Sequence, residues 1–351
     1  MNPARGIRRH DPAQDADWDR YAESHPRFTV YHRTAFRKAV AEAFGKEAHG
    51  LVATDEQGTV CGVLPLIRQR SPLFGDRLVS LPYANHGGPL ANGPETAVAL
   101  LQAAARHADA LGCDRLEIRD HELRALDWPE RTDKVLLTRE LPNSPEALDR
   151  ALGSKLRSQC RRAHKEGAEV LHGGAVLVPE FHAVFAENMR DLGTPVYPQR
   201  WFEVLARRFP AQSHIVVVRL AGRPAAAAFL MHWKDTLEIP WAASGREFNH
   251  YSVNMLLYRE ALARAIALGC RRFDFGRSTQ DSGPHRFKLQ WGAEASPIYW
   301  RVRPRDGASL NGRDAGGEQG RLKAMATRAW THLPLAVANR LGPLVAPELP
   351  W

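Results

Sequence analysis

One stretch of nine residues occurs twice in the chain in closely related form. Ala110–Ile118 (ALGCDRLEI) is repeated as Ala267–Phe275 (ALGCRRFDF). Each copy follows an alanine-rich helical pattern and contains a glycine, after which the pattern is that of a short strand with apolar residues alternating with an acidic one. A second related pair lies upstream, Leu51–Leu66 and Val216–Met231, and both members have the pattern of two strands joined by a tight turn. Repetition at this spacing indicates two copies of one α/β domain, because solenoid repeats are far shorter.

The order of the expected elements indicates the fold class. In each half a strand pair is followed by a helix and one more strand, which predicts a mixed sheet and not a doubly wound parallel one. We expect an N-terminal domain over residues 1–143 and a C-terminal domain over 144–303, with the active site in the second. The Gly-, Asp- and Arg-rich residues 304–320 predict a linker, and residues 321–351 predict an amphipathic helical tail.

Charge and cysteine content limit the classes of partner. The 351 residues carry a formal net charge of +9, which favours nucleic acid, phosphate-rich cofactors or an anionic membrane surface. The four cysteines are scattered without zinc-ligand spacing, so we expect neither a disulfide framework nor a metal site. Without an apolar run of signal-peptide or membrane-span length, the chain is expected in the cytoplasm. Its tail is expected to pack on the body or a partner, or to contact the inner face of the cytoplasmic membrane.

A segment at the end of the second repeat carries the residues with the clearest chemical potential. Asp274 lies on an alternating strand, where a buried carboxylate could accept a proton from an attacking amine; the alternative is a structural carboxylate, since Glu117 occupies the equivalent position in the first repeat. Gly276, Arg277 and Ser278 offer an amide, a guanidinium and a hydroxyl to an anion or oxyanion. We therefore predict catalytic roles for Asp274, Arg277 and Ser278 and donor binding by Gly276.

Two further sets of residues are candidates for substrate binding. Lys288 and Trp291 are three apart on an expected short helix, where they could bind a phosphate and stack on a ring, a surface lysine and a core tryptophan being the alternative. A basic helix follows Ser144, and its like charges four residues apart are destabilising unless a polyanion faces them. We expect this helix to bind donor phosphates, a solvated face being the alternative. Its candidate residues are Lys155, Arg157, Arg161 and Arg162.

Three segments, together with the repeat, resemble a known family over roughly residues 1–303. They are Ser154–Gly167 (SKLRSQCRRAHKEG), Phe273–Ser278 (FDFGRS) and Phe287–Gly292 (FKLQWG). The combination is similar to the FemAB family of tandem GNAT-fold acyltransferases, including its exosortase- and exopolysaccharide-associated branch. The resemblance implies transfer of an acyl or aminoacyl group, from acyl-CoA or aminoacyl-tRNA, to an amine of a cell-envelope polysaccharide or peptidoglycan precursor. Arg246–Ser252 (REFNHYS) replaces the usual phosphate-binding loop, a departure that weakens the case for coenzyme A.

The resemblance also implies that a groove binds the acceptor. We expect Tyr83, Asn85 and His86 to bind the acceptor there, a plain turn with a capping Asn85 being the alternative. Trp241, Tyr251 and Asn254 of the second half could line the same groove. Two other functions stay open at this point. One is a non-catalytic module that recognises an envelope glycan in an export system. The other is a tRNA-binding protein without transfer chemistry, whose affinity would fall steeply with salt.

Overall fold

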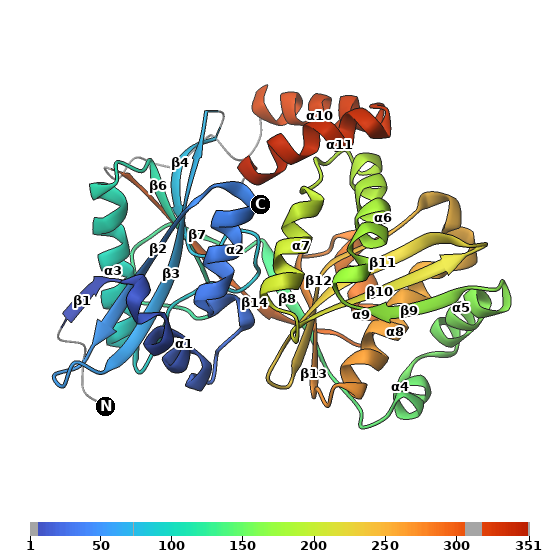
Figure 1. Ribbon diagram of the computed structural model, residues 1–351, viewed down its shortest axis with the longest axis horizontal. Coiled ribbons are helices and arrows are strands. Elements are labelled where there is room, and N and C mark those ends of the chain that lie inside the picture. Colours follow the sequence, from blue (N-terminus) through green and yellow to red (C-terminus); the bar gives the residue numbers. More distant parts are fainter. Residues whose placement is uncertain (1–5, 73, 306–317, 350–351) are drawn as a thin grey trace. The chain divides into compact units, whose positions relative to one another are not determined.

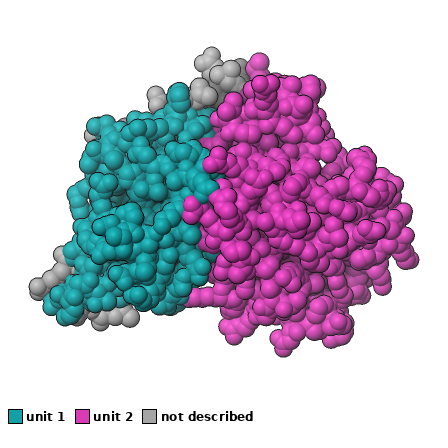
Figure 2. Space-filling view, viewed as in Figure 1, with its two compact units in different colours: residues 1–134, 297–316, 348–351 teal, residues 135–296, 317–347 magenta. Residues whose placement is uncertain are grey.

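The computed structural model describes residues 6–72, 74–305 and 318–349 of the chain, and Figure 1 shows its elements. The chain divides into two compact units, coloured separately in Figure 2. Unit 1 contains residues 1–134, 297–316 and 348–351, and unit 2 contains residues 135–296 and 317–347. Each unit is built around one mixed sheet, and the expected fold class of two tandem α/β domains with helices at the C-terminal end is confirmed.

In unit 1 the central part of the sheet is an antiparallel meander. It consists of β2 (Glu47–Thr54), β3 (Val60–Ser71) and β4 (Gly75–Val79). Helix α3 (Pro94–Ala110) then carries the chain to β6 (Arg115–Asp120), which pairs with β4 in parallel. The α3 side chains Leu100, Leu101 and Ala104 are fully buried in the core of this unit. The remaining strands are β1 (Gly6–Arg9), β5 (Leu90–Ala91), β7 (Glu130–Arg131) and β15 (Tyr299–Pro304). The other helices are α1 (Asp15–Ser24) and α2 (Thr34–Phe44). Two short 3₁₀ turns precede them, η1 (Pro12–Gln14) before α1 and η2 (Val30–His32) before α2.

Unit 2 repeats the same arrangement. The meander is β10 (Ser213–Leu220), β11 (Arg223–Trp233) and β12 (Thr236–Ser244). Helix α8 (Val253–Ala267) leads to β13 (Arg272–Thr279), which pairs with β12 in parallel. The elements β2, β3, α3 and β6 thus correspond in order to β10, β11, α8 and β13, as the two sequence repeats predict. The outer strands of this sheet are β9 (Glu169–Gly173), β8 (Lys134–Glu140) and β14 (Glu294–Pro297).

Alternating side chains of the unit 2 strands pack against helices on both faces. Ala228 and Leu230 of β11 belong to the core that α8 shares with α4 (Pro145–Ala151) and α5 (Ser154–Lys165). Phe229, which points the opposite way, packs against Phe181 of α6 (Val178–Asp191) and Phe202 of α7 (Gln199–Arg208). Because both faces are covered, a polar side chain at the centre of this sheet is buried. The other elements of the unit are η3 (Ala175–Leu177), η4 (Arg246–Tyr251), α9 (Gly283–Gln290), α10 (Glu318–Thr331) and α11 (Leu335–Val345), with η6 (Ala346–Glu348) at the end of the chain.

The sheets are completed by strands from outside the expected domains. β15 lies at residues assigned to the second domain, yet it pairs with β6 in the sheet of unit 1. β8 lies before the expected boundary at residue 143, yet it borders β13 in the sheet of unit 2. The chain therefore passes to unit 2 near residue 134 and back to unit 1 near residue 297, in place of the single division at 143/144, and residues 317–347 belong to unit 2 again. Most of the expected linker at 304–320 lies outside the described residues.

The C-terminal tail packs on unit 2. Helices α10 and α11 contact α6, and the Arg190 guanidinium donates a hydrogen bond of 3.2 Å to the Leu333 carbonyl. Ala338 and Gly342, four residues apart, form the buried side of α11. Packing on the body is one of the arrangements expected for the tail, and these helices show it. Within the described residues, no helix has the length and apolar character needed to cross a bilayer.

Candidate active site

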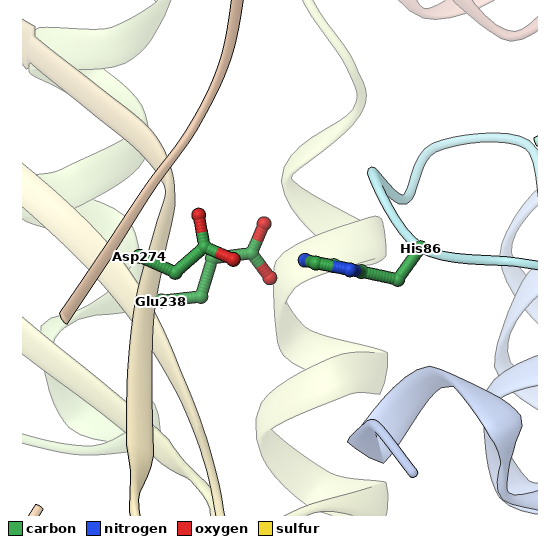
Figure 3. Close-up of side chains that lie close together, drawn as sticks. All are labelled: His86, Glu238 and Asp274. Carbon is green, nitrogen blue, oxygen red and sulfur yellow. The ribbon is translucent and has the colours of Figure 1, made fainter. Parts of the chain in front are cut away.

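Two buried carboxylates lie side by side on neighbouring strands of unit 2. Asp274 of β13 is directly opposite Glu238 of β12, and the two side chains point the same way (Figure 3). Asp274 is 2% exposed and Glu238 is fully buried. Figure 3 also labels His86, which is a residue of unit 1. Because two adjacent carboxylates repel one another in a medium of low dielectric, their burial requires a proton or a cation to offset the charge.

The pair lies where pairing between the two parallel strands ends. β12 and β13 are paired at Thr236–Arg272, Leu237–Phe273 and Glu238–Asp274. Both strands continue beyond these positions, to Ser244 and Thr279 respectively. A fork between parallel strands exposes backbone groups beside the functional side chains, which suits the binding of an extended substrate group.

A tight turn follows Asp274 and is held from two sides. Gly276 adopts a left-handed φ of 70°, and its N–H donates a hydrogen bond of 2.7 Å to Oδ1 of Asp274. Nζ of Lys288 donates to the carbonyls of Gly276 and Arg277 at 3.2 and 2.9 Å. The Ser278 hydroxyl, at the end of the turn, is buried and has no hydrogen-bond partner among the described residues. Asp274, Gly276, Arg277 and Ser278 thus lie together in one turn, and their catalytic and donor-binding roles stay predictions.

Lys288 is not the surface lysine given as the alternative to phosphate binding, because its side chain is buried. It is 8% exposed, and burial lowers its pKa to about 8, against the attraction of Asp274 and Glu238. Lys288 therefore anchors the turn and supplies positive charge near the two carboxylates. Trp291 is fully buried against Phe287 and Tyr258, so it packs in the core and is not available to stack on a ligand.

Glu238 is the residue of this cluster that the sequence analysis missed. A single acidic residue in the apolar strand TLEIPW was the available signal. Comparison of the two repeats shows that this acidic residue is found only in the second. In unit 1, the counterpart of Asp274 is Glu117, and the residue opposite Glu117 on β4 is Val79. Burial raises the pKa of Glu117, but the ion pair with Arg119 at 2.9 Å and the nearby Arg77 bring it below its usual value. The first repeat thus has one neutralised carboxylate, and the second has a carboxylate pair.

The basic helix α5 is largely available to solvent, with one exception. Arg157 donates hydrogen bonds to the carbonyls of Asp149, Arg150 and Leu152, so it caps the end of α4. Lys155, Arg161 and Arg162 are exposed, as the expected donor-binding face requires. The Cys160 thiol donates to the Met255 carbonyl at 3.5 Å, which brings the middle of α5 beside the first turn of α8.

The start of α8 lacks the glycine-rich phosphate loop. Residues Arg246–Tyr251 form the 3₁₀ turn η4, and Ser252 then takes a left-handed φ of 63° before the helix begins at Val253. Tyr251 packs against the core and Asn254 is partly buried in the first turn. Trp241 is packed among Trp201, Phe202 and Phe229, so its ring belongs to the aromatic core under α6 and α7.

The loop expected to bind the acceptor in unit 1 is strained and buried. Leu81 and Tyr83 adopt left-handed φ values of 52° and 70°, which non-glycine residues rarely do. The Tyr83 hydroxyl accepts a hydrogen bond of 2.9 Å from Gln69, so this side chain is turned into the unit. His86 stacks on His121 with ring centroids 4.5 Å apart, and the Asn85 carbonyl is 3.2 Å from the ring of His121. Binding of an acceptor by Asn85 and His86 stays a prediction.

Residues 153–289 match the family model described as an acetyltransferase (GNAT) domain. The second half of the chain is thus similar to a GNAT domain. The matched range includes the carboxylate pair, the turn after it, and both α5 and α8. No curated protein matches the chain in sequence.

Solved structures extend the likeness to the whole tandem fold. FemX has a TM-score of 0.61 at 14% identity, covering 84% of this chain and 97% of its own. The C-terminal domain of a protein named as a lysylphosphatidylglycerol synthetase from Agrobacterium fabrum has a TM-score of 0.56 at 15% identity, covering 91% and 97%. A tandem GNAT protein from the clavulanic acid biosynthesis pathway has a TM-score of 0.51 at 13% identity, covering 87% and 100%. The expected resemblance to FemAB-like tandem GNAT proteins is thus confirmed at the level of the fold.

Proposed function

We propose that this GNAT-fold protein is an acyltransferase that moves an acyl or aminoacyl group from an activated donor to an amine. The observation that carries the proposal is the buried pair Glu238–Asp274 at the fork of β12 and β13. The pair lies inside the segment that matches the GNAT family model, and the first repeat lacks it. A non-functional carboxylate pair would be expensive to keep buried, since replacement by apolar residues is often neutral or stabilising.

In the proposed reaction the carboxylate pair acts as the proton acceptor. The amine nitrogen attacks the donor carbonyl carbon, and the new C–N bond forms as the bond from that carbon to sulfur or oxygen breaks. Asp274 or Glu238 takes the proton that the amine loses, and the leaving thiolate or alkoxide is protonated in turn. The Ser278 hydroxyl and the Arg277 side chain are the proposed donors to the oxyanion. Positioning at the fork supplies the rest of the rate enhancement.

The donor is proposed to carry phosphate groups that bind along α5 and the start of α8. Lys155, Arg161 and Arg162 are exposed cations, and α5 is held beside the first turn of α8 by Cys160. A helix N-terminus favours anions, which adds to the attraction. Acyl-CoA and aminoacyl-tRNA both fit this description, and the absence of the glycine-rich loop favours the larger donor.

The acceptor is proposed to be an amine of a cell-envelope polysaccharide or peptidoglycan precursor, modified on the cytoplasmic side of the membrane. The resemblance to FemAB proteins supports this class. A structural neighbour named for lysylphosphatidylglycerol, an aminoacylated membrane lipid, points to the same compartment.

Substitution of the carboxylates tests the catalytic proposal. Asp274→Asn and Glu238→Gln remove charge and keep shape, so we expect loss of about a hundredfold or more in transfer rate. The measurement is release of coenzyme A or deacylated tRNA in the presence of a membrane-precursor extract. Glu294→Gln, at an exposed carboxylate of β14, is the control and should keep full activity. Full activity in both carboxylate variants would refute the assignment.

Binding assays separate the two donors and the rival functions. Thermal stabilisation by acetyl-CoA alone would identify an acyl-CoA enzyme, and salt-sensitive retention of charged tRNA alone would identify an aminoacyl transferase. If the wild type transfers no group with either donor while it retains an envelope glycan, the protein is a binding module. An Arg277→Ala variant that folds but loses transfer would exclude that module.

A further inference from the structure

The C-terminal helices carry an exposed apolar stripe that the fold of unit 2 leaves uncovered. Val337, Leu341 and Leu344 follow one another at spacings of four and three residues, which places them on one side of α11. Their exposed fractions are 40%, 42% and 72%. On α10, Met325 is 66% exposed. Large apolar side chains gathered on one helix face, in place of single scattered ones, mark an interaction surface.

The opposite side of the same helix is already used in packing. Ala338 and Gly342 are buried, and a Cβ at Gly342 would lie 2.9 Å from the backbone nitrogen of Val196. Gly193, just after α6, lies against Thr327 of α10, since an added Cβ at Gly193 would approach the Thr327 carbonyl oxygen to 2.4 Å. Thr327 therefore faces the body, and Met325, two residues away on α10, faces the other side. The tail is therefore docked with its small residues inward and its large apolar residues outward, the reverse of an ordinary surface helix.

The charges of the tail favour a membrane over a protein as the partner of this stripe. The sequence from Gln319 to Pro347 contains no Asp or Glu and four Arg or Lys residues, Arg321, Lys323, Arg328 and Arg340. The exposed Arg328 is three residues after Met325, and the exposed Arg340 is three after Val337 and four before Leu344, so these three apolar residues each have a cation on the same side of the helix. Apolar side chains flanked only by cations match the boundary between acyl chains and anionic headgroups.

We propose that α10 and α11 form a docking surface for an anionic lipid bilayer. Leu341, Leu344, Val337 and Met325 enter the interface, and Arg328 and Arg340 contact the headgroups. The surface lies outside the residues proposed for acyl transfer, so it can be tested without any substrate.

The test is co-sedimentation of the full chain with vesicles. The wild type is expected to bind vesicles of equal parts phosphatidylglycerol and phosphatidylcholine, and to bind phosphatidylcholine alone far more weakly. The double substitution Leu341→Gln with Leu344→Gln should lower the partition coefficient roughly tenfold or more. Arg328→Gln and Arg340→Gln should each lower it about fivefold at low salt, with a smaller effect at high salt.

The controls make the proposal refutable. Leu123→Gln removes an apolar side chain that is 69% exposed in unit 1, and it should leave vesicle binding unchanged. Unaltered thermal unfolding shows that the double variant is folded. The proposal is overturned if the wild type does not bind anionic vesicles, or if the double variant binds as well as the wild type. It is also overturned if the leucine substitutions abolish self-association in sedimentation velocity and leave vesicle binding intact, since the stripe would then bind a second copy.

Discussion

Lys288 is buried, and burial makes its ammonium form less stable than that of a lysine in water. Burial lowers its pKa to about 8 from the usual 10.5, and the attraction of Asp274 and Glu238 only partly opposes this. Between these two values the unfolded chain binds more protons at Lys288 than the folded chain does. The lysine therefore contributes least to stability below about pH 8 and progressively more as the pH rises toward 10.5.

Lys288→Met provides the corresponding measurement. The variant loses two hydrogen bonds to the Gly276–Arg277 turn, which predicts destabilisation of about 1–3 kcal/mol. The free energy of unfolding, measured in urea, should favour the wild type by about 2–3 kcal/mol more at pH 10 than at pH 7. Buried thiols and tyrosines contribute equally to the pH dependence of both proteins, so their contribution cancels in the difference between wild type and variant. A constant difference across this range would contradict the assignment, and Lys165→Met at an exposed position is the matched control.

The environment of some site residues can be predicted from the sequence, and that of others cannot. Strand periodicity places Asp274 on the face opposite Phe273 and Phe275, and its burial follows from the helices that cover both faces of the sheet. Glu238 and Lys288 acquire their roles from contacts across strands and from the helix beyond the turn, and local periodicity carries no information about such contacts. Arg157 shows the same limit, because a capping arginine and a phosphate-binding arginine have the same helical pattern.

At the scale of elements, a single glycine controls the docking of the tail. Gly342 allows α11 to approach the Val196 backbone, and an added Cβ would lie 2.9–3.0 Å from three atoms of Val196. Gly342→Ala should therefore weaken docking of α11 by about 1–3 kcal/mol, even though alanine favours the helix itself. Faster amide hydrogen exchange in α10 and α11, with the sheet of unit 2 unchanged, is the expected result. Gly153→Ala, where an added Cβ would meet nothing within 4 Å, is the control, and unchanged exchange in Gly342→Ala would show that this contact does not hold the tail.

The elements themselves were largely predictable, but the assignment of two strands to their sheets was not. The duplicated segments correctly indicated β6 and β13, each after its helix, because helix end, glycine and alternating strand are local signals. β8 and β15 have ordinary strand patterns, and nothing in either pattern identifies the neighbouring strand. Their partners are set by contacts that are distant in sequence, such as the ion pair of 2.9 Å between Arg301 of β15 and Glu130 of β7.

At the scale of the whole molecule, this exchange of strands means that neither sequence half contains a complete sheet. β15 contributes the buried Trp300, Arg301 and Val302 to unit 1, and the Arg119 guanidinium lies 4.3 Å from the centre of the Trp300 ring. A fragment of residues 1–143 lacks all of these contacts. Each large apolar side chain lost removes about 1.5–3 kcal/mol, a large share of a total stability of about 5–15 kcal/mol.

We therefore expect the fragment 1–143 to lack a cooperative unfolding transition in urea when it is followed by circular dichroism. Joining residues 1–134 through a flexible Gly/Ser linker to residues 297–305 restores β15 to the edge of β6, and this fragment should unfold cooperatively. Unit 2 gives the matched comparison, because residues 135–296 include most of β8 and residues 144–296 lack it. Cooperative unfolding of 1–143 with the same midpoint as the β15-containing fragment would mean that the first repeat folds alone. If the β15-containing fragment does not unfold cooperatively, β15 must fold together with unit 2. The two repeats would then be a single cooperative unit despite their separate cores.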